Sequence, residues 1–305
     1  MMKPKIPARF TRTDSWAGIW YLLHGCVLWF GSGFSAYALW QLEAWPPVLR
    51  LPLIALATVG AAAGMFFLGS LGHEGFHGNL HRQRDVSMLM GIVGSLGAPL
   101  FLSTGVNLGH WRHHSHTNTE RDPDFVLYRG NRSLLARLRV PLSTSAQSLR
   151  NVAGLLVGNV PMDSAIPFSR RRMQGYVLLN IVLVGASTTA FAVLAFKDPV
   201  LFACLVAAPA LVAQAYWSLH PYIEHGGTGT QAHLAARNCT SPVYRVLLLG
   251  YTWHLCHHLY PRVQTHKLPA LARHLREVGY FGDDVVDEPR LLGALRTGMT
   301  RALSA

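Results

Sequence analysis

The chain has 305 residues, of which 50% are hydrophobic and only 14% are charged. Soluble domains usually carry roughly 25% charged residues, so this composition argues against an ordinary soluble protein and indicates a membrane protein. The net charge is +12, but no nucleic-acid-binding motif accompanies it, and basic loops beside anionic lipid account for it. The four cysteines are isolated and form no CxxC pair, which argues against a disulfide framework, an iron–sulfur cluster and a zinc ribbon.

Four windows are apolar enough to cross a membrane. A transmembrane helix needs about 20 consecutive apolar residues, and residues 16–40, 48–70, 176–196 and 199–219 meet this requirement with Arg50 as their one charged residue. A soluble protein would instead need four buried helices without a polar face. We therefore predict an all-α, polytopic membrane protein in which residues 1–305 form a single domain with four transmembrane helices.

The first two windows lead into a histidine cluster. Four of the five charged residues before position 16 are basic, which favours a cytoplasmic N-terminus. The first window then runs outward, and the second returns as a helix that continues into HEGFHGNLH at 73–81. His73, His77 and His81 are spaced four residues apart, so we expect them close to one helix face.

The next apolar window, residues 87–104, is interrupted by Gly91, Gly94, Gly97 and Pro99. If this window crossed the membrane, the first histidine cluster would lie on the opposite side from the second cluster, and the two could not share a metal site. We therefore expect residues 87–104 to be membrane-embedded or interfacial, and not to cross.

Two further clusters have the same pattern, HxxHH. They read HWRHH at 110–114 and HLCHH at 254–258. On a helix this spacing should aim the imidazoles at i, i+3 and i+4 toward one point. A further histidine, His225 in YIEHGG, follows the fourth window. Of the 16 histidines, 12 lie in or near these four places, whereas histidines scattered through a core do not cluster in this way.

We predict that the four segments assemble one metal site on the cytoplasmic side, in a histidine-rich helical cap. Imidazole suits iron, zinc and copper. Nine candidates exceed the four ligands of a structural zinc ion and the three protein ligands of a catalytic one, so we expect two metal ions. The predicted ligands and catalytic residues are His73, His77, His110, His113, His114, His225, His254, His257 and His258, and His81 is a further candidate ligand.

Acidic residues beside the clusters are expected to orient the ligands. Glu74, Asp122, Asp124 and Glu224 could accept the free N–H of a coordinating imidazole, although Asp122 and Asp124 could equally be solvated surface acids. The remaining histidines are expected to be hydrogen-bonded supports or to have no role at the site: His116, His220 and His233 in the first case, and His24, His266 and His274 in the second.

The distribution of basic residues supports this topology. Of the 27 lysines and arginines, Arg50 and Lys197 alone face outward in this topology, and the other 25 lie on the histidine side. The positive-inside rule places such residues in the cytoplasm. We therefore expect a multi-pass protein of a bacterial inner membrane, with its active site on the cytoplasmic side.

The three clusters resemble the histidine boxes of the membrane fatty acid desaturase and hydroxylase superfamily. The segments RDPDF at 121–125 and LYPRV at 259–263 fit the same family, as does the extra histidine in YIEHGG. The resemblance covers about residues 60–270. It implies a non-haem di-iron centre that uses O2 and two externally supplied electrons to remove hydrogen from an unactivated C–H bond.

The resemblance leaves the reaction outcome open. HEGFHGNLH and RDPDF are similar to sequences of carotenoid hydroxylases and ketolases as well as of acyl-lipid desaturases, and alkyl or fatty acyl hydroxylases share the scaffold. We favour a fatty acid desaturase that acts on membrane lipid. The chain contains no flavin, nicotinamide or haem module, so the resemblance implies an external ferredoxin-, rubredoxin- or cytochrome-type electron donor, which basic residues would attract if it is acidic.

Two other classes of protein compete with this interpretation. HEGFH also matches HExxH, the zinc motif of metalloproteases, in which Glu74 would be the general base. An intramembrane protease of this kind leaves both HxxHH clusters and His225 unexplained. A metal transporter should carry its ligands within the spans, whereas here the histidines follow the ends of the apolar windows.

Overall fold

The structure, a computed structural model, describes residues 3–128, 133–160, 162, 165–290, 292, 293 and 296. Within these residues the fold is mostly helical with almost no strand, which confirms the predicted fold class. The strands β1 (Asn238–Cys239) and β2 (Asp287–Glu288) pair in parallel over two residues each.

Four helices in the described residues are long and apolar enough to cross a membrane, and each contains one of the four predicted windows. The helices extend the windows at one or both ends. In chain order they are α2 (Ser15–Cys26) with η1 (Val27–Gly31) and α3 (Ser32–Gln41); α4 (Pro47–His77); α11 (Arg170–Lys197); and α12 (Pro199–Phe202) with η2 (Ala203–Ala207) and α13 (Ala208–His225).

Helix α4 connects the membrane region to the histidine cluster. Its 31 residues correspond to about 46 Å at about 1.5 Å per residue, whereas the hydrocarbon core of a bilayer is about 30 Å thick. The first half of α4 exposes Val48, Leu49 and Leu56, while the second half is mostly buried. Helix α4 is thus longer than the hydrocarbon is thick, and its buried last turns carry His73 and His77.

The first and fourth long helices are joined at their π-turns, η1 and η2. The indole N–H of the buried Trp29 donates to the backbone carbonyl of Leu205 at 2.6 Å. Gly33 permits the close approach, because a Cβ at this position would lie 2.6 Å from the Leu205 side chain. Tyr37, near the end of α3, donates its hydroxyl to Asp198, which lies between α11 and α12, at 2.8 Å. The two predicted outer turns therefore lie at the same end of the molecule.

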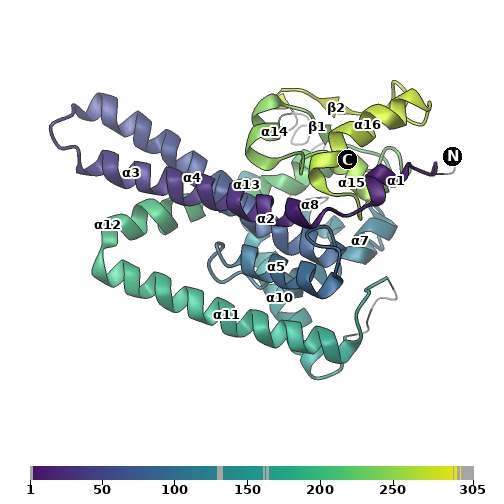
Figure 1. The fold of residues 1–305 in the computed structure, drawn as a ribbon, viewed down its shortest axis with the longest axis horizontal. Coiled ribbons are helices and arrows are strands. Elements are labelled where there is room, and N and C mark those ends of the chain that lie inside the picture. The colour runs from purple at the N-terminus through teal and green to yellow at the C-terminus, as the bar shows by residue number, and fades with distance from the viewer. Residues whose placement is uncertain are drawn as a thin grey trace.

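Short helices form a cap at the other end of the long helices (Figure 1). They are α1 (Ala8–Thr11), α5 (Arg84–Ser95), α6 (Ser103–Asn107), α7 (His110–His116), α8 (Phe125–Tyr128), α9 (Leu134–Leu138), α10 (Val140–Leu156), α14 (Pro242–Leu248), α15 (His254–Leu259), the 3-10 turn η3 (Thr265–Lys267) and α16 (Leu268–Glu277). Helical segments thus surround the predicted histidine site. The side of the membrane on which this cap lies stays a prediction.

The window at 87–104 is divided between α5 and α6. Helix α5 has 12 residues, about 18 Å, which is too short to cross the hydrocarbon. It packs closely against α4, because Gly75 and Gly91 face each other: a Cβ on either glycine would lie 2.7 Å from a backbone carbonyl of the other helix. Its placement within or beside the membrane stays a prediction.

Candidate metal centre

The nine predicted ligands converge at the cap end of the long helices and divide into two groups. In each group, one ligand atom per residue lies within 4.8 Å of every other. The five-histidine group consists of His73, His77, His110, His114 and His257. The four-histidine group consists of His113, His225, His254 and His258. Two groups fit the predicted count of two metal ions.

Both HxxHH clusters are helical, in α7 and α15, but the prediction that each aims three imidazoles at one point is wrong. In α7 the i and i+4 residues join the five-histidine group, and the i+3 residue, His113, joins the four-histidine group. Helix α15 does the reverse, because its i+3 residue, His257, joins the five-histidine group. Each box therefore serves both groups.

Helix α4 ends before it reaches His81, so the predicted face of three histidines is also wrong. Gly78 adopts a left-handed conformation at φ 82°, and the N–H of Asn79 donates to the carbonyl of Glu74 at 2.9 Å. This is a Schellman ending, which turns the chain away after His77. His81 belongs to neither histidine group in the described residues, and its Nδ1 accepts from the backbone N–H of Gln83 at 3.0 Å.

His225 is positioned by the end of α13 and by a buried arginine. Arg237 is 1% exposed and donates to the backbone carbonyls of Tyr222 and Ile223 at 3.3 and 2.9 Å. Both carbonyls belong to the last turn of the helix, where helical N–H partners run out, although that of Tyr222 also accepts from the N–H of Gly226. Arg237 thereby fixes the turn that carries His225, a role that the sequence alone did not indicate.

Partners outside the groups hold most of the ligands by Nδ1. Three of the four predicted acids do so: Glu74 on His73 at 3.1 Å, Asp122 on His113 at 2.8 Å, and Glu224 on His254 at 3.0 Å. Asp122 is 3% exposed, so it is no solvated surface acid. Asp124 lies farther from His113, at 3.8 Å. A proton held at Nδ1 leaves Nε2 as the free lone pair for a metal.

The sequence did not indicate two of these partners, Thr117 and Ala235, or a further contact made by Tyr128. Thr117 contacts Nδ1 of His258 at 3.1 Å, and the carbonyl of Ala235 contacts Nδ1 of His225 at 2.9 Å. Tyr128 donates to Asp122 at 3.0 Å and stacks on the His225 ring at an interplanar angle of 19°. A backbone carbonyl has no sequence signal. Thr117 lies three residues after the second box, but the ring that it contacts, His258, belongs to the third box on another helix.

Where Nδ1 carries the proton, the inner Nε2 atoms face one another as lone pairs. Nε2 atoms face one another at 2.7 Å between His73 and His110, and at 2.9 Å between His254 and both His225 and His258. A cation between such lone pairs removes their repulsion. Both ring nitrogens of the buried His257 also lack a hydrogen-bond partner, and buried polar atoms without partners are uncommon. The residues therefore fit metal ions, with imidazole as the donor throughout.

Burial favours the neutral form of several candidate ligands. It lowers the pKa of His110, His114, His257 and His258 well below the ordinary value of 6.5, and neighbouring imidazoles lower these pKa values further. His113 differs: burial is again the largest influence and opposes protonation, but Asp122 and Asp124 together raise its pKa. Neutral imidazole is the form that coordinates a metal, so most of the site is prepared for binding at neutral pH.

Comparison with known protein families agrees with the histidine boxes. The family model described as "Fatty acid desaturase" matches residues 43–288, which include all nine candidate ligands. The chain belongs to the fatty acid desaturase family. A search of curated proteins found no match. The family and the four apolar helices indicate an integral membrane protein, and the family and the histidine groups support an oxidoreductase of the lipid-chain desaturase or hydroxylase type.

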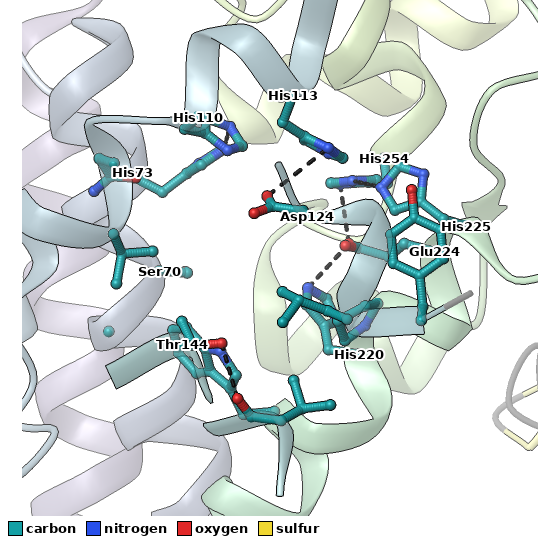
Figure 2. Close-up of a pocket in the computed structure, with 18 of the residues that line it drawn as sticks. Ser70, His73, His110, His113, Asp124, Thr144, His220, Glu224, His225 and His254 are labelled. Atoms are coloured by element: carbon teal, nitrogen blue, oxygen red, sulfur yellow. Dashed lines mark hydrogen bonds and ion pairs between the residues drawn. The ribbon is translucent and has the colours of Figure 1, made fainter. Parts of the chain in front are cut away.

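This desaturase-family site borders a cavity of about 130 Å³ (Figure 2). Both histidine groups contribute to its wall, with His73 and His110 from one and His113, His225 and His254 from the other. The opposite wall is formed by residues of the long helices and of the cap, which include Ser70, Phe101, Thr144 and Trp217. The cavity thus contacts both groups at once.

The other histidines lie outside both groups of the family site. His220 lines the cavity, and its Nε2 lies 3.0 Å from Glu224, which also contacts His254 (Figure 2). His233 lies 3.6 Å from Asp284. His24 contacts the carbonyl of Leu247, and His266 contacts the hydroxyl of Tyr21. The support predicted for His220 therefore acts through Glu224, a shared carboxylate.

Proposed function

We propose that this protein is an O2-dependent di-iron oxidoreductase that acts on a lipid hydrocarbon chain, and specifically a fatty acid desaturase. One observation carries the proposal: a single small cavity touches both histidine groups, and its other walls combine Trp217 of a membrane-crossing helix with apolar cap residues such as Phe101 and Val140. A hydrocarbon from the bilayer could reach both metal positions there without passing through water.

The ligand set supports iron as the cofactor. The two groups offer nine imidazoles, and the family supports a lipid-chain oxidoreductase. When bound, two iron ions would supply the chemistry that activates O2 with two external electrons and oxidises an unactivated C–H bond. The protein's own residues would hold the ions through Nε2, direct their Nδ1–H groups at the carboxylates of Glu74, Asp122 and Glu224, and exclude bulk water from the cavity.

The cavity size suits part of a hydrocarbon chain. At about 130 Å³ it is slightly smaller than the engineered cavity of about 150 Å³ that binds benzene. A short stretch of methylene groups therefore fills it, and the rest of the chain must lie elsewhere. Ser70 and Trp217 come from the two long helices that end in ligands, α4 and α13, so the reacting carbons would be aligned by the same helices that hold the metals.

The protease alternative loses support from the position of Glu74. Its side chain is 1% exposed, contacts His73 and accepts from the side chain of Asn79 at 2.8 Å. A general base must be within reach of a water molecule beside the metal, whereas Glu74 does not line the cavity. Its contacts are those of a residue that orients a ligand.

We also propose that the cap faces the cytoplasm of a bacterial inner membrane and receives electrons from an external ferredoxin-, rubredoxin- or cytochrome-type donor. The positive-inside rule supports this orientation, because 25 of the 27 basic residues belong to the histidine side of the predicted topology.

The test is a mass-spectrometric comparison of lipids from a host that makes both fatty acids and carotenoids. The host would express the wild type or His257→Ala, and we expect acyl chains that lack two hydrogens with the wild type alone. Oxygen added to a carotenoid or acyl chain would instead assign the hydroxylase or ketolase reaction, which the boxes also fit. Identical lipids in both strains, with iron and a donor supplied, would contradict the proposed function.

A further inference from the structure

A second cavity reaches the five-histidine group from the cap. It has a volume of about 150 Å³ and is bounded by His77 at its inner end and by Arg82, Arg84 and Arg262. No described residue lines both this cavity and the one that borders both histidine groups. The metal centre can therefore be approached by two separate routes, one apolar and one basic.

The positive charge of this second cavity is not compensated by its walls. No carboxylate is among its described lining residues. The nearest acid in sequence, Asp85, is paired with Arg172 at 3.0 Å, and no ion pair joins Arg82, Arg84 or Arg262 to a described acid. Burial and the neighbouring charge of Arg84 lower the pKa of Arg262. Three guanidinium groups held near one another favour an anionic partner.

An aromatic contact links this basic surface to the candidate ligands. The Arg262 guanidinium lies over the Trp111 ring, 5.7 Å from its centroid. Trp111 is buried, and its ring packs edge-on against His77 at 4.6 Å between centroids. An exposed arginine, a buried indole and a candidate ligand thus form a continuous line of contacts from the surface to the five-histidine group.

We propose that Arg82, Arg84 and Arg262 form the docking site of a small acidic electron-carrier protein, with Trp111 between the carrier and His77. The proposal rests on the function proposed above. Each docked carrier is oxidised by one electron, which passes through the Trp111 contact and reduces the centre by one electron. Two successive dockings supply the two electrons that one turnover with O2 requires.

The position of the cavity favours a protein carrier over a lipid head group. Helix α4 is about 46 Å long, and a bilayer with its head groups is about 40–45 Å thick. Arg82 and Arg84 follow the end of α4, and Thr11 and Thr13 of the N-terminal segment line the same cavity. The arginines therefore lie at the aqueous edge, where a soluble partner can reach them.

The experiment measures binding of an acidic plant-type [2Fe–2S] ferredoxin to the protein in nanodiscs of phosphatidylcholine, a lipid without net charge. The test variant is Arg84→Glu with Arg262→Glu. The matched control is Arg150→Glu with Arg245→Glu, which changes the net charge equally at two exposed positions outside the cavity. We expect the test variant to raise the Kd about tenfold and to weaken its salt dependence, and the control to change the Kd less than about twofold.

Equal weakening by both variants would overturn the proposal, because net charge alone would then explain binding. Unchanged binding by the test variant would also overturn it. If that variant instead lost anionic phospholipid that copurifies with the wild type, the cavity would belong to a lipid head group. Iron content and lipid products separate the two proposals. If docking alone is wrong, the wild type still binds iron and forms the expected lipid products. If the proposed function is wrong, the wild type shows neither.

Discussion

The two histidine groups differ in how their ligands are held. In the four-histidine group, every ring has a partner at Nδ1: Asp122, Ala235, Glu224 and Thr117 serve His113, His225, His254 and His258. In the five-histidine group, Glu74 serves His73, whereas Nδ1 of His77 and of His114 and both ring nitrogens of His257 have no hydrogen-bond partner among the described residues.

This difference teaches that outer partners orient the rings of the four-histidine group, whereas the five-histidine group has more ligands but fewer such partners. Outer partners fix the rotation of a coordinating ring and increase its basicity. The four-histidine group is therefore prepared before a metal arrives. The five-histidine group has one more ligand and fewer outer partners, so the metal itself must order several rings. We expect the four-histidine group to fix the ligand geometry more tightly, and the five-histidine group to tolerate the loss of an outer partner better.

The largest expected effect comes from removing a ligand. His257→Ala and His258→Ala alter adjacent positions of α15 that belong to different groups. Each variant should lower bound iron from about two to about one per chain and reduce turnover by more than about 100-fold, beyond the roughly 10–100-fold typical of losing an outer partner. Iron analysis of the membrane-inserted variants measures this effect. Full activity in either variant would contradict the division into two groups.

Exchange of an outer carboxylate for its amide compares the two groups directly. Asp122→Asn removes the charge beside His113, and Glu74→Gln removes the charge beside His73. We expect Asp122→Asn to weaken metal binding by about 10–100-fold and Glu74→Gln to have a smaller effect, because four other histidines remain in its group. Competition with a chelator measures both affinities. A larger loss with Glu74→Gln would reverse the comparison.

Filling the cavity should affect substrate without affecting metal. Ser70→Leu and Thr144→Leu place a larger side chain in a space of about 130 Å³. Turnover should fall roughly tenfold, since overpacking costs about 1–3 kcal/mol, while both groups keep their iron. Thr189→Leu, at an exposed position of α11, is the control and should leave turnover unchanged. Loss of iron in the cavity variants would mean that they disturb the ligands and do not test substrate binding.

The smallest expected effect is on the stability of the metal-free protein at mildly acidic pH. The pKa values of His110, His114, His257 and His258 lie well below 6.5 in the folded state and near 6.5 in the unfolded state. Below pH 6.5 the unfolded chain binds more protons, so the free energy of unfolding decreases as the pH falls. Thermal unfolding in detergent from pH 8 to pH 5 should show a falling Tm. A Tm that rises over this range would contradict the burial of neutral imidazoles.

Much of the fold and the candidate ligands could be predicted because their signals are local. Apolar length alone identifies a span, and histidine spacing within five residues identifies a box. The division of each box could not be predicted in this way. On a helix, positions i+3 and i+4 lie about 60° and 40° to either side of i, so which one joins i depends on where the other helices stand. That arrangement is set by contacts between segments more than 100 residues apart, such as His258 with Thr117.

His81 does not join the helix face predicted for it, and the cause is local. The pattern of apolar and histidine residues does not reveal this cause. Gly78 can adopt the left-handed conformation that ends α4, and the periodic spacing of the histidines hides this stop. Arg237 shows the opposite case. No histidine box lies near it in sequence, yet it closes the end of α13 from a distance of 12 residues along the chain.

The reciprocal division of the two boxes has a consequence for how the centre fills. Helices α7 and α15 each contribute to both groups, so an ion in one group immobilises the backbone that presents ligands to the other. Binding of the first ion carries the entropy cost of ordering this backbone. The second ion binds to an already ordered site, so the two ions bind with positive cooperativity. Native mass spectrometry during an iron titration should show empty and doubly loaded chains with few singly loaded ones, and a dominant singly loaded form would show that the two groups fill independently.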